Sequence, residues 1–441
     1  MSEPLKVYES LNSAFSIGCD PITGIHILNP QSKNYPIKIV ANGGAQLMNS
    51  HHYADRYSSP ESAEIVRTNQ ELVTGFMLAF SNSGDLFYFT SSNPSITIAT
   101  LQKIHDSYAR VGISIARDYR HVEDIDKVDF RDSAVKPHVF SPEILRPLGM
   151  AETGIRNVLA YKKNVHQFLW NHYGIPTPPT SYLNGNAPDN LRHDLEMFRN
   201  YEELVVNGPD GCGGYGFMIT PNSHTVVQKI KDESKDVLQV QGRLPLLTSP
   251  GVSFYIGDTD IVYLGGAEQR FIKPGQHAGN IWTKGIEDEW NNTFSDFNKT
   301  IFAGVRVLQN FGVRGNVNLD VLGLAEEVSR RYGLSRVLLR EANIRPGGSA
   351  VMFRLQSNAD VDGLPPSTII TNTAVCIRPE VFFDSELLGR LNCERNMRTV
   401  IYNYYKPQER AYLAFMGNDR VTISDVQAYE EATLRDLHTW G

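Results

Sequence analysis

The sequence predicts an α/β protein with more than one domain. Short apolar runs typical of buried strands alternate with amphipathic helical segments over the first 140 residues and again further along. The chain has 441 residues, enough for two or three domains with large cores. Its 41% hydrophobic and 21% charged residues are ordinary for a globular protein, so no fibrous or disordered class is indicated.

Bulk properties exclude several classes of function. The net charge of −7 gives no general attraction to nucleic acid or to an anionic membrane. The first residues, MSEPLKVYESLNS, lack the features of a secretory signal, and the longest apolar stretch, VTGFMLAF, is too short to span a bilayer. Four cysteines without CxxC spacing fit a reducing compartment. We therefore expect a cytoplasmic protein without nucleic-acid or membrane partners.

The N-terminal segment predicts an α/β unit that ends near residue 150. Strands are expected at 36–40, 75–80 and 86–92, each an apolar run next to turn residues. An amphipathic helix is expected over 101–113. The segment SPEILRPLGM, with two prolines and a glycine, then predicts a boundary at 140–150.

The middle of the chain begins with a helix over 155–173, which carries Lys162 and Lys163 and stops at GIPTP. A solvated helix face is the plain interpretation of the two lysines. Strands at 203–206 and 217–220 flank a loop with four glycines. Such a loop suits a phosphate cradle, although a simple hairpin fits the pattern as well. A further strand is expected over 237–244.

The last part of the chain predicts mostly strands. Two strands lie within 248–266, followed by a polar loop at 268–282 and a helix at 298–311. Two strands, 312–321 and 337–345, flank a short excursion. After them come a helix, the aromatic run IYNYYKPQERAYLAF and a final acidic helix.

The clearest chemical signal lies on the strands at 312–321 and 337–345. Strand side chains alternate, so Asn318 and Asp320 share a face, as do Glu341, Asn343 and Arg345 at about 7 Å intervals. Antiparallel pairing would bring Asp320, Glu341 and Asn343 together as an oxygen donor set that suits magnesium. Arg345 would hold a carboxylate or an acyl phosphate beside them. The alternative is an exposed strand face that only meets solvent.

The order of these features resembles the ATP-grasp superfamily between about residues 160 and 350. The order comprises a lysine helix ending in GIPTP, a glycine-loop hairpin, a hinge strand, the SPGV strand pair, and Asp and Glu-x-Asn on paired strands. The segments GVRGNVNLDV and LREANIRPGG are similar to those of D-alanine–D-alanine ligase. The SPGV strand, Gln269, Gly279-Asn280 and R-x-GG resemble the pheganomycin type of peptide ligase.

The resemblance implies an ATP-grasp fold with a pre-ATP-grasp α/β domain (1–150), an N-lobe (151–245) and a C-lobe with a C-terminal extension (246–441). It implies ATP and magnesium, or manganese, as cofactors, with Asp320, Glu341 and Asn343 as metal ligands. The implied nucleotide contacts are Lys163, Gly211, Gly213, Gly214, Gly216, Gln241, Gly242 and Arg243. The implied catalytic arginines are Arg345, Arg314 and Arg340. The implied substrate contacts are Gln269, Arg270, His277, Asn280, Gly347 and Gly348.

Two positions depart from the family pattern. The first hairpin strand usually carries a second phosphate lysine, where this chain has Asn207. Lys229, Arg270 or Lys273 would have to supply the missing charge. The arginine that precedes the metal aspartate in D-alanine–D-alanine ligase is Asn318 here, so other arginines must contact the acyl phosphate.

The resemblance implies an ATP-dependent carboxylate–amine ligase that forms an amide or peptide bond through an acyl phosphate. Amino acids or small carboxylic acids of natural-product metabolism, with an amine, are the expected substrates. The glycine loop and residues 268–282 are the expected lids. A homodimer is expected by analogy. Two alternatives are an ATP-binding protein of the same fold without ligase activity, which Asn207 favours, and a biotin-carboxylase or purine-type ATP-grasp enzyme.

Overall fold

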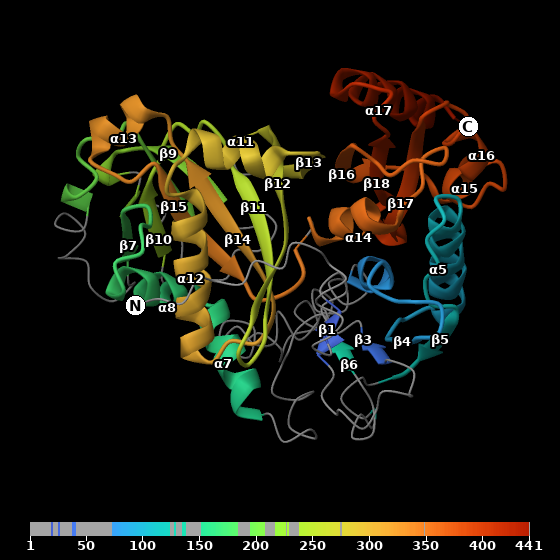
Figure 1. Cartoon of the computed structure of the whole chain (residues 1–441), viewed down its shortest axis with the longest axis horizontal. Helices are drawn as coiled ribbons and strands as arrows, with labels where there is room; N and C mark the ends of the chain where they lie inside the picture. The colour runs from blue at the N-terminus through green and yellow to red at the C-terminus, as the bar shows by residue number, and fades with distance from the viewer. Residues whose placement is uncertain are drawn as a thin grey trace.

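The computed structural model contains three β-sheets with helices packed against them (Figure 1). The sheets follow one another along the chain, and the largest belongs to the C-terminal half. The residues that the structure describes are 19–20, 25–26, 38–40, 73–123, 128, 135–137, 151–183, 195–207, 217–225, 227–228, 238–273, 276–347 and 349–440.

The N-terminal sheet has the strand order β1-β2-β6-β3-β4-β5, and its neighbours from β6 to β5 pair in parallel. The strands predicted at 36–40 and 86–92 are confirmed as β3 and β4. The predicted helix at 101–113 is confirmed as α5, which begins earlier because Asn93 accepts a hydrogen bond from the Ile96 amide at 3.3 Å. The elements are β1 (Cys19–Asp20), β2 (Ile25–His26), β3 (Lys38–Val40), β4 (Leu86–Phe89), α5 (Pro94–Ala109), β5 (Asp118–His121) and β6 (Val135–Pro137).

The strand expected at 75–80 is wrong, because residues 73–78 form a helix. Almost every side chain from 73 to 80 is buried, so the run is apolar on all sides. A short, fully buried run of this kind has no periodicity that separates a helix from a strand. A hydrogen bond joins the end of this segment to the chain after α5, because the Ala116 amide donates to Ser81 Oγ at 2.9 Å.

The small sheet is antiparallel, with the order β7-β10-β8-β9. It confirms the three strands predicted at 203–206, 217–220 and 237–244. One of its faces is an apolar core that contains Leu204, Val206, Leu238 and Val240. The other face is polar and lies toward α8. The strands are β7 (Thr180–Leu183), β8 (Glu203–Asn207), β9 (Phe217–Pro221) and β10 (Leu238–Gly242).

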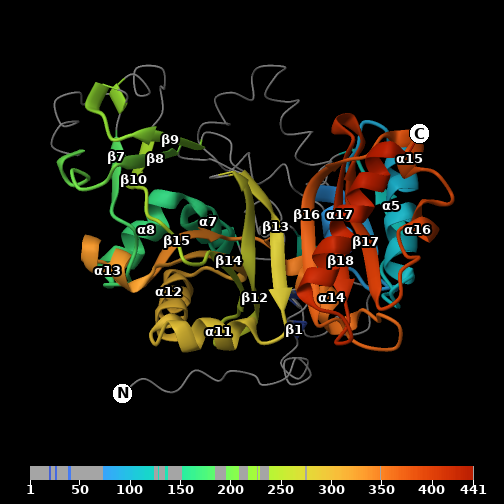
Figure 2. The ribbon, with the colours of Figure 1, turned by 90° about the horizontal axis from the view of Figure 1, so that it is seen from above.

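The large sheet is antiparallel throughout and has the order β15-β14-β11-β12-β13-β16-β18-β17 (Figure 2). It confirms the strands predicted within 248–266 and at 312–321 and 337–345. The aromatic run at 401–415 supplies two strands of its far end. The strands are β11 (Pro250–Ile256), β12 (Ile261–Lys273), β13 (Gln276–Thr283), β14 (Gly315–Gly323), β15 (Val337–Asn343), β16 (Thr368–Cys376), β17 (Met397–Tyr405) and β18 (Arg410–Gly417).

The loop expected at 268–282 is wrong. β12 extends to Lys273 and β13 begins at Gln276, so most of this segment is strand in the middle of the large sheet. Its polar side chains suggested a loop because their partners are distant in sequence. Glu268, Gln269 and Arg270 bond respectively to Thr248, Asp320 and Glu430.

The helix predicted over 155–173 is two helices, because Lys162 has an extended backbone with φ −69° and ψ 127°. The imidazole Nδ1–H of His166 donates to the Ala160 carbonyl at 2.9 Å and satisfies an acceptor at the break. The helix predicted at 298–311 is confirmed as α12. The helices after residue 150 are α7 (Ala151–Tyr161), α8 (Lys163–His172), α11 (Ile286–Thr293), α12 (Phe297–Phe311), α13 (Glu326–Tyr332), α14 (Ala350–Asn358), α15 (Pro379–Phe382), α16 (Leu387–Arg390) and α17 (Ile423–Thr439).

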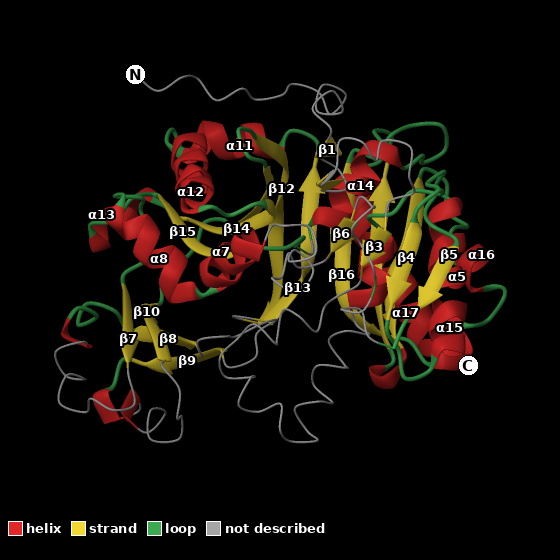
Figure 3. Ribbon diagram, turned by 90° about the horizontal axis from the view of Figure 1, so that it is seen from below, coloured by secondary structure: helices red, strands yellow, loops and turns green. Residues whose placement is uncertain are grey.

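Helices connect the sheets to one another. α8 lies between β15 and the small sheet, and α12 packs beside it on β15 (Figure 3). At that contact the Trp170 indole N–H donates to the Gly304 carbonyl at 3.1 Å. α5 packs against β17, so the N-terminal unit contacts the far end of the large sheet. None of the helices within the described ranges is both long and apolar enough to cross a membrane.

Candidate active site

Two neighbouring strands of the large sheet place the acidic residues together. Asp320 on β14 is the register partner of Glu341 on β15, and Asn318 is the partner of Asn343. The register shifts directly after this pair, since Val321 pairs with Leu339. Arg340 is therefore the extra residue of a β-bulge, a feature that re-aims side chains at a strand. The strand pairing predicted from alternation is confirmed.

Helix α8 contacts the bulged segment of β15 through one face. Three of its side chains, spaced i, i+3 and i+4, lie on the same side of a helix and reach three consecutive residues of the strand. All three are at most 8% exposed. The contacts are Lys163 Nζ to Glu341 Oε2 at 3.5 Å, the Ala342 amide to His166 Nε2 at 3.4 Å, and Gln167 Nε2 to the Arg340 carbonyl at 2.9 Å.

The two facing carboxylates have opposite pKa shifts. Burial, and then the neighbouring charge of Glu341, raise the pKa of Asp320 to about 6. Burial alone would also raise the pKa of Glu341, but Lys163 and Arg340 hold it below its usual value. The pair therefore concentrates negative charge in a partly buried place, with Arg345 as a further compensating cation for both groups.

Amide groups surround the Asp320 carboxylate. Gln269 Nε2 donates to Oδ1 at 2.8 Å and Asn318 Nδ2 to the same oxygen at 3.2 Å. Asn343 Nδ2 lies 3.4 Å from Oδ2. The side-chain oxygen of Asn318 in turn accepts from Ser253 Oγ at 2.9 Å, so the orientation of the carboxylate is set by residues from four strands, β11, β12, β14 and β15.

The residues fit a magnesium site. Asp320, Glu341 and Asn343 offer two carboxylates and an amide oxygen, which is the oxygen-rich set that Mg²⁺ prefers, with positions left for water and phosphate. The raised pKa of Asp320 also indicates uncompensated negative charge, which a cation would relieve. No group of three or more His, Cys, Asp and Glu residues that could hold a metal occurs in the described part of the chain, so a nitrogen- or sulfur-rich site is not indicated there.

Three of the residues predicted to contact a nucleotide lie on β10 of the small sheet or directly after it: Gln241, Gly242 and Arg243. Gln241 is 3% exposed and donates through Nε2 to Thr180 Oγ1 at 3.0 Å. A Cβ at Gly242 would come within 2.3 Å of the Tyr201 ring, so this glycine is required by packing. Arg243 forms an ion pair with Glu203 at the end of the sheet.

The predicted substrate residues of β12 and β13 divide among three places. Gln269 joins the acidic pair through Asp320. His277 Nε2 lies 3.4 Å from Asn280 Oδ1, and burial lowers the pKa of His277. Arg270 belongs elsewhere, because its guanidinium donates at 2.7 Å to the buried carboxylate of Glu430 on α17. Arg270 therefore connects β12 to the C-terminal helix.

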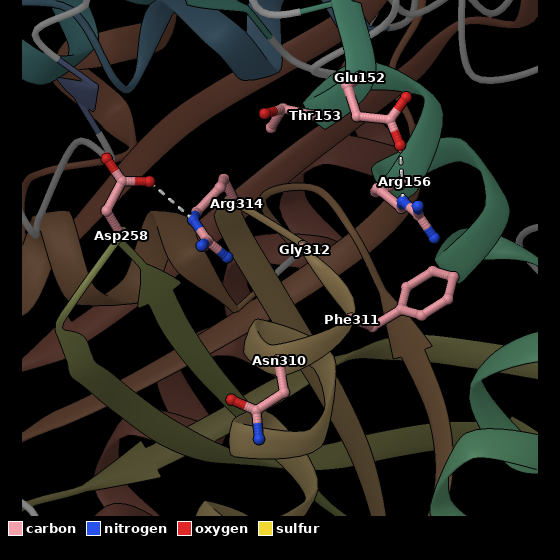
Figure 4. Close-up of a pocket in the computed structure, with 8 residues that line it drawn as sticks. All are labelled: Glu152, Thr153, Arg156, Asp258, Asn310, Phe311, Gly312 and Arg314. Carbon is pink, nitrogen blue, oxygen red and sulfur yellow. Dashed lines mark hydrogen bonds and ion pairs between the residues drawn. The ribbon is translucent and has the colours of Figure 1, made fainter.

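The structure does not bring Arg314 to the acidic pair, which corrects the expectation that it contacts an acyl phosphate. Arg314 precedes β14, and six residues of strand separate it from Asp320, or about 20 Å. It donates to Asp258 at 2.9 Å in a hollow of about 390 Å³ (Figure 4). In the same hollow Arg156 bonds to Glu152 at 2.9 Å, so the charges there are already paired.

Of the two glycines after Arg345, Gly347 is described, and a Cβ there would lie 2.8 Å from Asn318 Cγ. Gly347 thus permits the close approach of this turn to the acidic strands. Several predicted residues lie outside the described ranges: Gly211, Gly213, Gly214, Gly216, Lys229 and Gly348.

Sequence reasoning missed the residues that support this site. His166 and Gln167 follow Lys163 at helical spacing, and Gln239 precedes Gln241 by two on a strand, so both patterns were available in the sequence. Tyr182 and Ser253 carry no such signal. Their roles depend on pairing between strands that are distant in sequence.

This chain resembles several solved structures over most of its length at low sequence identity. N5-carboxyaminoimidazole synthetase from Staphylococcus aureus, complexed with ADP, matches with a TM-score of 0.55 and 10% identity over 91% of this chain and 97% of that chain. N5-carboxyaminoimidazole synthase from Aspergillus clavatus, with ADP and 5-aminoimidazole ribonucleotide, matches with a TM-score of 0.51 and 12% identity over 91% and 98%.

Biotin carboxylase from Campylobacter jejuni, in a β,γ-ATP complex, matches with a TM-score of 0.51 and 10% identity over 91% of both chains. The chain has the ATP-grasp fold. No family model and no curated protein sequence matches it. At these identities the likeness establishes the ATP-grasp fold and leaves the reaction to be argued from the residues.

Proposed function

We propose that this protein is an ATP-dependent ligase that joins a carboxylate to an amine. The observation that carries the proposal is the partly buried Asp320–Glu341 pair with Lys163 Nζ 3.5 Å from Glu341 Oε2, on an ATP-grasp fold. Facing carboxylates with adjacent cations are costly to bury and suit the binding of a metal–nucleotide complex. Structures of similar fold are complexes with ADP and with a β,γ-ATP ligand, which supports nucleotide binding as part of the proposal.

The proposed reaction has two steps. A carboxylate oxygen of the substrate attacks the γ-phosphorus of ATP, and ADP leaves as the P–O bond to the β-phosphate breaks. The nitrogen of the amine then attacks the carbonyl carbon of the acyl phosphate, inorganic phosphate leaves, and the nitrogen loses a proton. Bound magnesium would neutralise phosphate charge and be held by Asp320, Glu341 and Asn343.

The residues of the chain have distinct tasks in this scheme. Lys163 supplies a positive charge to the phosphates from a helix fixed on β15. Arg340 and Arg345 place positive charge beside the acidic pair, where an acyl phosphate would carry negative charge. Gln269, Asn318 and Asn343 orient the Asp320 carboxylate. The proposed acids are amino acids or other small carboxylic acids.

A second candidate is carboxylation of a nitrogen, with bicarbonate in the place of the organic acid. The fold likeness favours it, since the similar structures are named as N5-carboxyaminoimidazole synthetases and a biotin carboxylase. The REANIRPGG segment favours the peptide-ligase candidate. The two candidates share the nucleotide chemistry and differ in the acid that is activated.

The test is ADP release from magnesium ATP with pooled amino acids, small carboxylic acids and amines, and in parallel with bicarbonate and amines. Glu341→Gln is the blank, and Glu431→Gln, an exposed acid on α17, is the matched control. We expect ADP release that depends on the organic acids and disappears in Glu341→Gln. Release that depends only on bicarbonate would select the carboxylation candidate. Tight ATP binding without ADP release would favour a non-catalytic protein.

A further inference from the structure

Asn207 stands where the resemblance to ATP-grasp ligases implies a phosphate-binding lysine, and the structure gives it a definite environment. It is the last residue of β8, is 3% exposed, and faces Gln239 across the sheet. Gln239 in turn faces Tyr182 on β7. These three side chains share the polar face of the small sheet, next to α8.

The direction of every hydrogen bond in this cluster follows from one backbone carbonyl. The Arg340 carbonyl can only accept, so the amide nitrogen of Gln167 must be the donor at 2.9 Å. The Gln167 oxygen therefore accepts, and it receives the Tyr182 hydroxyl at 2.6 Å and Gln239 Nε2 at 3.0 Å. Gln239 then turns its oxygen toward Asn207, whose Nδ2 lies 3.3 Å away. The Asn207 oxygen is left at the end of the chain of amides.

Gln241 is oriented in the same way by a second carbonyl. Thr180 Oγ1 donates to the Pro178 carbonyl at 2.8 Å, so its hydroxyl hydrogen is used there. Thr180 must then accept from Gln241 Nε2, at 3.0 Å. The Gln241 oxygen is thereby turned away from Thr180. Within the described part of the chain, no donor bonds to the oxygen of Gln241 or of Asn207.

The polar face thus presents two fixed hydrogen-bond acceptors. Gln239 and Gln241 are two residues apart on β10, so the acceptors Asn207 and Gln241 lie on one face of adjacent strands. An amide oxygen attracts N–H donors and disfavours phosphate oxygens, which are themselves acceptors. Gln167 is one helical turn, about 6 Å, from Lys163 on α8, so this face adjoins the proposed phosphate site.

We propose that Asn207 is a specificity-determining residue whose amide oxygen recognises the exocyclic amino group of the nucleotide's purine base, and that it is not a phosphate ligand. The inference rests on the proposed nucleotide site. A 6-amino purine offers the donor that the Asn207 oxygen requires, whereas a 6-oxo purine would place an acceptor against that oxygen. On this proposal, the asparagine at position 207 contacts the purine base, whereas the lysine that the resemblance implies there would contact the phosphates.

The test compares the dissociation constants of ATP, GTP and purine riboside 5′-triphosphate, which lacks the 6-amino group but keeps the ring and the phosphates. For the unaltered protein we expect ATP to bind at least about tenfold more tightly than either analogue. In Asn207→Leu the ratio between ATP and purine riboside triphosphate should fall to about one, through loss of ATP affinity alone. Thr220→Val, a buried change on the opposite face of the same sheet, should keep the original ratio.

Two results would overturn the inference while leaving the proposed function intact. One is equal loss of affinity for ATP and for purine riboside triphosphate in Asn207→Leu, which would make Asn207 a phosphate or general binding residue. The other is equal binding of ATP and GTP to the unaltered protein, a comparison that needs no folded variant. Absence of binding by any triphosphate would instead overturn both the inference and the proposed function.

Discussion

Asp320→Asn should stabilise the metal-free protein at neutral pH while removing its activity. The pKa of Asp320 rises from its ordinary value of 3.8 to about 6 in the fold, because burial and Glu341 disfavour its charge. At about 1.4 kcal/mol for each tenfold change, the ionised group costs the folded state about 3 kcal/mol. An asparagine avoids this cost but loses an acceptor for the surrounding amides, worth about 1 kcal/mol. The expected net gain is about 2 kcal/mol.

The sign of the pH dependence follows from proton binding. Between about pH 4 and pH 6 the folded state holds more protons at Asp320 than the unfolded state does, so the stability of the unaltered protein falls as pH rises through this window. Above it the cost is fully present. Asp320→Asn should therefore be about 1 kcal/mol less stable than the unaltered protein near pH 4 and about 2 kcal/mol more stable at pH 7.

The assay is urea unfolding at pH 4.5 and pH 7.5 with a chelator present, followed by intrinsic fluorescence. Asp419→Asn, at an exposed aspartate, is the control and should leave the urea midpoint unchanged at both pH values. A variant that is less stable than the unaltered protein by the same amount at both pH values would refute the argument. That result would mean that the hydrogen bonds to Asp320 outweigh its charge.

Two further predictions concern packing. Gly304→Ala should destabilise the protein by about 1–3 kcal/mol, because a Cβ there would lie 2.1 Å from a leucine methyl of β15. The control is Gly389→Ala, where a Cβ would meet nothing within 4 Å. In thermal unfolding of both variants, the control should be close to the unaltered protein. Glu430→Ala should lower the free energy of unfolding by about 3–5 kcal/mol, because it leaves the partly buried arginine of β12 without its carboxylate partner. The control is Glu431→Ala, at the exposed neighbouring residue, which should change the urea midpoint little. Equal effects within either pair of variants would contradict the packing described here.

Local pattern predicted which residues of the candidate site come together. Strand alternation was sufficient to bring Asp320, Glu341 and Asn343 together, because the pairing is regular from Asn343 to Glu341 and the bulge begins only beyond that pair. The same rule could have excluded Arg314, since strand rise alone puts it about 20 Å from Asp320. The supporting shell was not predictable, because its contacts join α8, the small sheet and β15 across long sequence separations.

The failures of secondary-structure prediction have related causes. The polar segment at 268–282 is strand because partners elsewhere in the fold, such as Asp320 for Gln269, satisfy its side chains. At the helix break at Lys162, His166 donates to the Ala160 carbonyl and accepts from the Ala342 amide of β15, a partner distant in sequence. In each case tertiary contacts override a local preference.

The most direct test of the account is ATP binding with and without magnesium, measured by calorimetry on the unaltered protein and on Lys163→Met. Lys163 is buried beside Glu341, so its removal should weaken magnesium-ATP binding about 10- to 100-fold, as expected for a lost charge-assisted hydrogen bond. Lys162→Met, the adjacent residue at the helix break, should bind normally. Equal affinity of Lys163→Met and the unaltered protein, or binding that ignores magnesium, would contradict the placement of the nucleotide at this site.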